Sequence, residues 1–108
     1  MDEPKIAANG YVSALSPADR LPEPGEVAIC RKFLAQCERT RTGRIGSYGL
    51  KHMVERTEGT YVSNGALLQA CRDLGIRADQ ITSGVHRSPN GMVAVSRRSV
   101  RRLSGGRS

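Results

Sequence analysis

The stretch SNGALLQACRDLG, residues 63–75, carries the clearest secondary-structure signal in the sequence. Ser63 is a residue type that caps helix N-termini, and Gly75 is the type that ends helices, because glycine accepts the left-handed conformation common there. The apolar residues between them recur at helical spacing and are Leu67, Ala70, Cys71 and Leu74. The stretch therefore predicts a capped helix over residues 64–74 with one buried face.

Two more helices are predicted on the N-terminal side of this stretch. Pro24-Gly25-Glu26 begins a helix over about residues 25–39, and Ser47 can cap another over about 48–57. Their apolar stripes consist of Val27, Cys30, Phe33, Leu34 and Cys37 in the first and Leu50, Met53 and Val54 in the second. The polar and basic segment 40–45 is expected to be a loop, and residues 1–24, with four prolines, an irregular arm.

On the C-terminal side the period of the pattern changes. Ile76–Thr82 and Met92–Ser96 are short β-type segments, and Ser88-Pro89-Asn90-Gly91 between them is a strong turn signal. A β-hairpin is therefore expected. Ser96 can cap a final short helix with Val100 and Leu103 inward, and residues 104–108 are expected to be a flexible tail.

Together these elements predict one α+β domain over residues 25–103, between the arm (1–24) and the tail (104–108). Its order is three helices, then a β-hairpin and a short C-terminal helix, which is typical of a winged helix-turn-helix. Another helix-turn-helix placement could begin at residues 70–76, but Gly84 and Pro89-Asn90-Gly91 would interrupt its second helix.

The charge distribution favours nucleic acid as a partner. The chain of 108 residues has a formal net charge of +7, and residues 30–108 hold 15 of its 17 basic and five of its ten acidic side chains. Such a basic segment attracts phosphate polyanions through Coulomb attraction and counterion release. The plainer alternative is that the arginines only keep the protein in solution.

The predicted fold assigns these bases to a duplex DNA surface. The third helix would enter the major groove, the hairpin would act as a wing, and the C-terminal arginines would hold phosphates. The candidate nucleic-acid-binding residues are Ser63, Asn64, Gln69, Arg72, His86, Arg87, Arg97, Arg98, Arg101 and Arg102. Single-strand binding normally uses aromatic platforms, and only Tyr11, Phe33, Tyr48 and Tyr61 are aromatic, which favours duplex DNA.

The sequence offers no complete catalytic or cofactor site, so we expect a protein that is not an enzyme and needs no cofactor. His52 and Glu55 could share a helix face, but one such pair is weak evidence for a metal. Three cysteines without paired spacing indicate buried thiols rather than disulfides. With no apolar run long enough to span a membrane and no signal peptide, we expect a cytoplasmic protein, either a monomer or a homodimer.

The stretches Ser47-Tyr48-Gly49-Leu50-Lys51-His52 and Tyr61-Val62-Ser63-Asn64-Gly65 carry a resemblance, together with Glu55, Gly75 and Pro89-Asn90. The chain resembles a group of short bacterial proteins that occur in phage, plasmid or other mobile DNA. The resemblance transfers no catalytic residues. It implies a bacterial, mobile-element context, in which the alternative role is an adaptor or inhibitor that binds a host or phage protein.

Overall fold

The computed structural model of the protein describes residues 4–14, 16–84 and 86–105. The outer ends of the predicted arm and tail, 1–3 and 106–108, lie outside this part. The elements in chain order are β1 (Ile6–Ala7), β2 (Gly10–Tyr11), α1 (Pro24–Leu34), β3 (Ile45–Gly46), α2 (Ser47–Glu58), α3 (Asn64–Leu74), β4 (Ala78–Ser83), β5 (His86–Val93) and α4 (Arg97–Leu103).

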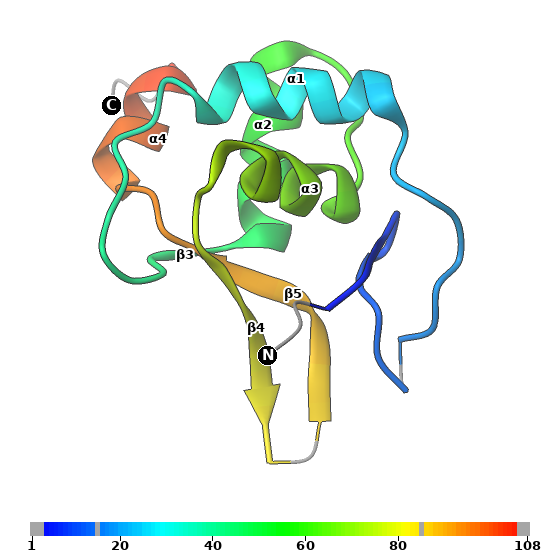
Figure 1. The fold of residues 1–108 in the computed structure, drawn as a ribbon. Helices are drawn as coiled ribbons and strands as arrows, with labels where there is room; N and C mark the ends of the chain where they lie inside the picture. The colour runs from blue at the N-terminus through cyan, green and yellow to red at the C-terminus, as the bar shows by residue number, and fades with distance from the viewer. Residues whose placement is uncertain (1–3, 15, 85, 106–108) are drawn as a thin grey trace.

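Helix α3 is the central element of the fold (Figure 1). It has the predicted bounds, because the Ser63 hydroxyl accepts a hydrogen bond from the Ala66 N–H at 3.0 Å and Gly75 ends the helix with φ at +71°. Its side chains Leu67, Ala70 and Cys71 face α1 and α2, while Leu68 packs against the β1–β2 hairpin. Because α3 is buried on opposite sides, α1 and α2 pack on one side of it and the β1–β2 hairpin packs on the other.

The predicted element order is wrong, and with it the winged helix-turn-helix assignment. The described chain has four helices and two small sheets: β1 pairs with β2 before the first helix, and a second sheet has the order β3-β5-β4. Strand β3 begins at Ile45, the last residue of the segment expected to be a loop, and β1 and β2 lie in the expected irregular arm. Strands of two residues are too short for the alternation by which a strand is recognised in a sequence.

The predicted turn at Pro89-Asn90-Gly91 is also wrong, because these residues lie inside β5. The chain reverses at Gly84, where Ser83 pairs with His86. Gln80 pairs with Gly91 and Thr82 with Arg87, so the segment 88–90 stands opposite Ile81 as a bulge. A bulge accommodates a proline within a strand, since the residue needs no ladder hydrogen bond there.

The three cysteines are free and buried, as the sequence predicts. Burial raises the pKa of the Cys30 and Cys71 thiols to about 12, so both stay in the unreactive thiol form at neutral pH. Among the described residues, no helix is long and apolar enough to cross a membrane.

The contact between β1 and α3 leaves no space for a side chain at Gly65. A Cβ there would lie 1.7 Å from the Ala7 carbonyl oxygen, whereas a Cβ at Gly49 in α2 would meet no other atom within 4 Å. We therefore expect Gly65→Ala to lower the free energy of unfolding by about 1–3 kcal/mol or more, through overpacking. Gly49→Ala should raise it by up to about 1 kcal/mol, because alanine is the better helix former.

Urea denaturation followed by circular dichroism measures both changes. Because both variants replace a helical glycine with alanine, their difference isolates the contact with β1. Equal effects of the two substitutions would show that the hairpin does not rest on α3 as described.

Candidate functional site

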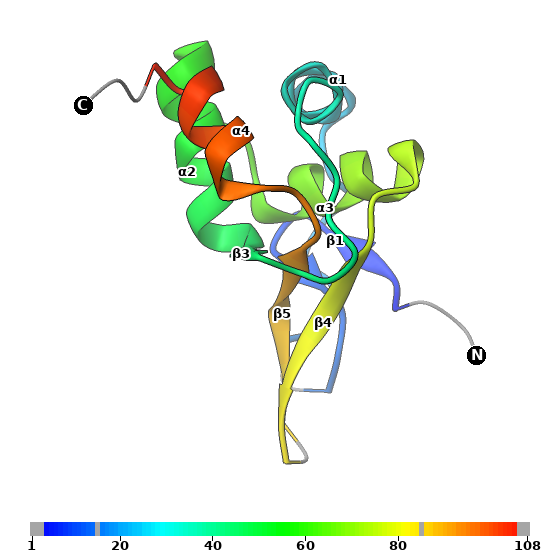
Figure 2. The ribbon, with the colours of Figure 1, turned by 90° about the vertical axis from the view of Figure 1, so that its left-hand side faces the viewer.

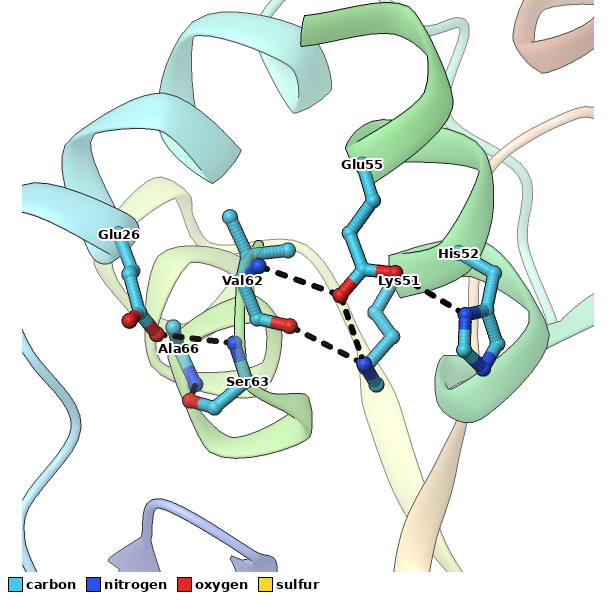
Figure 3. Close-up of polar contacts among 7 residues, drawn as sticks. All are labelled: Glu26, Lys51, His52, Glu55, Val62, Ser63 and Ala66. Atoms are coloured by element: carbon cyan, nitrogen blue, oxygen red, sulfur yellow. Dashed lines mark hydrogen bonds and ion pairs between the residues drawn. The ribbon is translucent and has the colours of Figure 1, made fainter. Parts of the chain in front are cut away.

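The first two residues predicted to read DNA, Ser63 and Asn64, are buried at the start of α3. Besides capping the helix with its hydroxyl, Ser63 donates its backbone N–H to Glu26 Oε1 at 2.9 Å (Figure 3). Asn64 donates its side-chain amide to the loop between β1 and β2 and to the β5 bulge. Both side chains therefore hold the fold together and are not displayed to a groove.

The other two predicted reading residues, Gln69 and Arg72, are half-buried on α3. The Gln69 amide donates to Asp73 Oδ1 at 2.9 Å, and the Arg72 guanidinium donates to the Pro4 carbonyl oxygen at 2.9 Å. Elements pack on opposite sides of α3, so the helix has no open face long enough to enter a major groove. The four α3 candidates do not form one exposed surface.

His86 and Arg87 are exposed near the tip of the β4–β5 hairpin. This tip projects from the body at the end opposite to α4, as both ribbon views show (Figures 1 and 2). The hairpin residues and the C-terminal arginines are therefore not brought together.

The four C-terminal arginines lie on α4, which forms because Ser96 caps it by accepting the Ser99 N–H at 3.0 Å. Val100 is buried against the core, and the four arginines are exposed. Sequence reasoning placed this helix and its cationic side correctly. The sequence did not indicate that Arg41 and Arg44, from the segment 38–44, lie in a part of the chain that adjoins this helix.

The 38–44 segment runs alongside the chain leading into α4. The Thr40 and Arg44 N–H groups donate to the Ala94 and Val93 carbonyl oxygens, each at 2.9 Å. From α4, the Arg97 guanidinium donates to the Arg44 carbonyl oxygen at 2.9 and 3.1 Å. We use the name arginine face for the exposed arginines of α4 and of the adjoining residues 41–44, namely Arg41, Arg44, Arg97, Arg98, Arg101 and Arg102.

None of these six arginines forms an ion pair within the described residues. Arg97 and Arg98 each stand four residues before another arginine on α4, a spacing at which like charges destabilise a helix by about 0.2–0.5 kcal/mol per pair. Glu38, which accepts from the Ser96 hydroxyl at 3.0 Å, is the acidic side chain beside the start of α4. The arginine face therefore lacks neutralising partners among the described residues, and a bound anion would reduce the repulsion between its arginines.

A second polar cluster surrounds the buried Lys51 on α2, and the sequence did not predict it (Figure 3). Lys51 Nζ donates to Glu55 Oε2 at 2.8 Å and to the Val62 carbonyl oxygen at 3.2 Å. Glu55 also accepts from the Val62 N–H at 3.3 Å and lies 3.0 Å from His52 Nδ1. The available signal was local, since Lys51 and Glu55 stand four residues apart on α2, the spacing of a helical ion pair.

Glu55 stays ionised because its partners outweigh its burial. Burial alone would raise the pKa of the Glu55 carboxyl, but hydrogen bonds from Lys51, the Val62 N–H and His52 bring the pKa below its ordinary value of 4.5. The side chains of His52 and Glu55, expected to share a helix face, are in contact, with His52 Nδ1 3.0 Å from Glu55 Oε1. No group of three or more His, Cys, Asp or Glu residues able to hold a metal occurs in the described part of the chain.

We expect Glu55→Gln to lower the free energy of unfolding at pH 7 by on the order of 2–4 kcal/mol, because Lys51 would be left buried without its counter-charge. The Glu55 pKa is depressed in the folded protein. Its stabilising contribution is therefore complete above the ordinary value of 4.5 and is lost as the pH falls through the lowered value. In Glu55→Gln, the free energy of unfolding should no longer show this fall at low pH.

Chemical denaturation between pH 3 and pH 7 measures the effect, with Asp79→Asn as the matched control. Asp79 pairs with Arg77 at 2.7 Å, but both side chains are exposed, so its loss should change stability by less than about 1 kcal/mol. An acid dependence unchanged in Glu55→Gln would contradict the assignment of this carboxylate.

No protein-family model, curated protein or solved structure matches this chain. The chemistry of its own side chains is therefore the basis for assigning a function. The described residues offer two features for that assignment: the exposed arginine face and the polar cluster around the buried Lys51.

Proposed function

We propose that this protein binds nucleic acid, with the phosphate backbone lying on the arginine face. The observation that carries the proposal is the set of six exposed arginines, contributed by α4 and the 38–44 segment and without an ion pair in the described structure. Guanidinium groups donate hydrogen bonds to phosphate in a fixed, bidentate geometry. Phosphate neutralisation would also remove the repulsion between neighbouring arginines on α4.

Contacts of this kind fix the position of a strand but do not read its sequence. The expectation of duplex DNA depended on α3 as a reading helix and on the small number of aromatic residues, and α3 is enclosed by other elements. The arginine face by itself supports binding of a phosphate backbone, and both duplex and single strands supply one.

The test replaces Arg98, Arg101 and Arg102 by alanine and measures binding of labelled nucleic acid by fluorescence anisotropy over a series of salt concentrations. Arg97 is left in place because its guanidinium supports the Arg44 backbone. The triple variant should bind more weakly, and the slope of log K against log salt should fall by roughly 2–3, about 0.7–0.9 for each lost phosphate contact.

The matched control replaces three exposed basic residues outside the arginine face by alanine, and so removes the same three positive charges. These residues are Lys5, Arg20 and Arg77. It should keep most of the slope, because net charge acts more weakly than local contact. Absence of binding by the unmodified protein at low salt would overturn the proposal. Stoichiometric recovery of one partner protein after nuclease treatment would then support the adaptor role.

A further inference from the structure

A pocket of about 410 Å³ lies beside the Lys51 cluster and has no role in the phosphate contacts proposed above. We call it the tyrosine pocket. Three separate parts of the chain form it: the loop between β1 and β2, the segment from α2 to the start of α3, and the β5 bulge. Its lining side chains include Tyr48, Lys51, Tyr61, Asn64, Pro89 and Asn90. A volume of this size accommodates a small organic group.

Two aromatic rings at the pocket are open to solvent. Tyr48 and Tyr61 are 56% and 57% exposed, although tyrosine is a side chain that is usually at least half-buried. The Lys51 ammonium lies 5.6 Å from the centre of the Tyr48 ring and 4.7 Å from that of Tyr61, which holds the rings near one cation. Exposed rings in fixed positions suit the stacking of a planar ligand.

Asn64 joins two walls of the pocket. Its Nδ2 lies 3.0–3.2 Å from three acceptors, namely Asn9 O, Pro89 O and Asn90 Oδ1, so the orientation of the amide is fixed. Its Oδ1 is buried and has no partner in the described structure. Because this oxygen is buried, Asn64 serves the pocket by tying its walls together and is not an exposed acceptor for a ligand.

The charge balance of the pocket disfavours a simple anion. Glu55 already neutralises Lys51 at 2.8 Å, so a free phosphate would find no net positive charge there. Lys51 uses two of its three N–H donors, on Glu55 and the Val62 carbonyl oxygen, and one is left for a ligand acceptor. A fitting ligand is therefore planar and neutral, with a hydrogen-bond acceptor on its edge.

We propose that the tyrosine pocket binds an unpaired nucleobase, stacked on Tyr48 or Tyr61. This inference rests on the proposed nucleic-acid function and narrows it to strands with unpaired bases. A base inside a duplex is covered on both faces and cannot enter such a pocket. The arginine face holds the backbone, and the pocket adds affinity for bases.

The experiment compares three single strands of about 12 nucleotides, within the range of single-strand site sizes. One is oligodeoxyadenylate, one carries abasic spacers with the same phosphates, and one carries unsubstituted purine, which stacks like adenine but lacks the N6 amino group. We expect adenine to bind roughly 5- to 100-fold more tightly than the abasic strand, the range for one stacked base. Purine should bind nearly as tightly as adenine, because its ring system stacks in the same way.

Two pairs of variants locate the effect on the protein. Tyr48→Ala and Tyr61→Ala remove one ring each, and Tyr48→Phe and Tyr61→Phe are the matched controls that keep it. At least one alanine variant should lose most of the preference for adenine over the abasic strand, with its phenylalanine control unchanged. Thermal melting checks that each variant is folded, which we expect because both rings are mostly exposed.

The outcomes separate the two proposals. Equal, salt-dependent binding of adenine and abasic strands would overturn the pocket assignment and leave the arginine face standing. A base preference that survives in both alanine variants would also overturn it. Absence of binding to every strand at low salt would instead overturn the nucleic-acid function itself.

Discussion

The close approach of the β1–β2 hairpin to the first turn of α3 is the contact on which most of this structure depends. The Gly65 N–H donates to the Ala8 carbonyl oxygen at 2.9 Å, and only a residue without a side chain permits that distance. Asn64 beside it ties the hairpin loop to the β5 bulge. The N-terminal segment, the central helix and the larger sheet are thus joined by two consecutive residues.

This contact explains why part of the fold could be predicted from the sequence and part could not. Helix α3 was predicted with its observed bounds because capping by Ser63 and termination at Gly75 are local signals. The β1–β2 hairpin has no local signal of that kind. The hairpin forms because Ile6 and Tyr11 pack against Leu68 of α3, and these contacts join residues about 60 positions apart in the chain.

The candidate sites divide in the same way. The arginines of α4 could be recognised because they are adjacent in sequence. The segment that carries Arg41 and Arg44 is held beside them by hydrogen bonds from the Thr40 and Arg44 N–H groups to residues 94 and 93, and by the Arg97 guanidinium. The tyrosine pocket is assembled from segments up to about 80 residues apart, so no spacing in the sequence reveals it. Ser63 and Asn64 were assigned to DNA from their residue types and their place at the start of the predicted reading helix, but both are buried and hydrogen-bonded within the fold.

The β5 bulge has a thermodynamic consequence as well as a geometric one. It brings one wall of the tyrosine pocket from the central strand of the larger sheet, while the other walls come from the hairpin loop and from α2 and α3. The complete pocket exists only when all three parts are assembled, so any occupant binds the folded chain and not the unfolded one. At a concentration 100 times its dissociation constant, such an occupant would add about 2.7 kcal/mol to the free energy of unfolding. Occupancy and folding of this small domain are therefore linked equilibria, and each shifts the other.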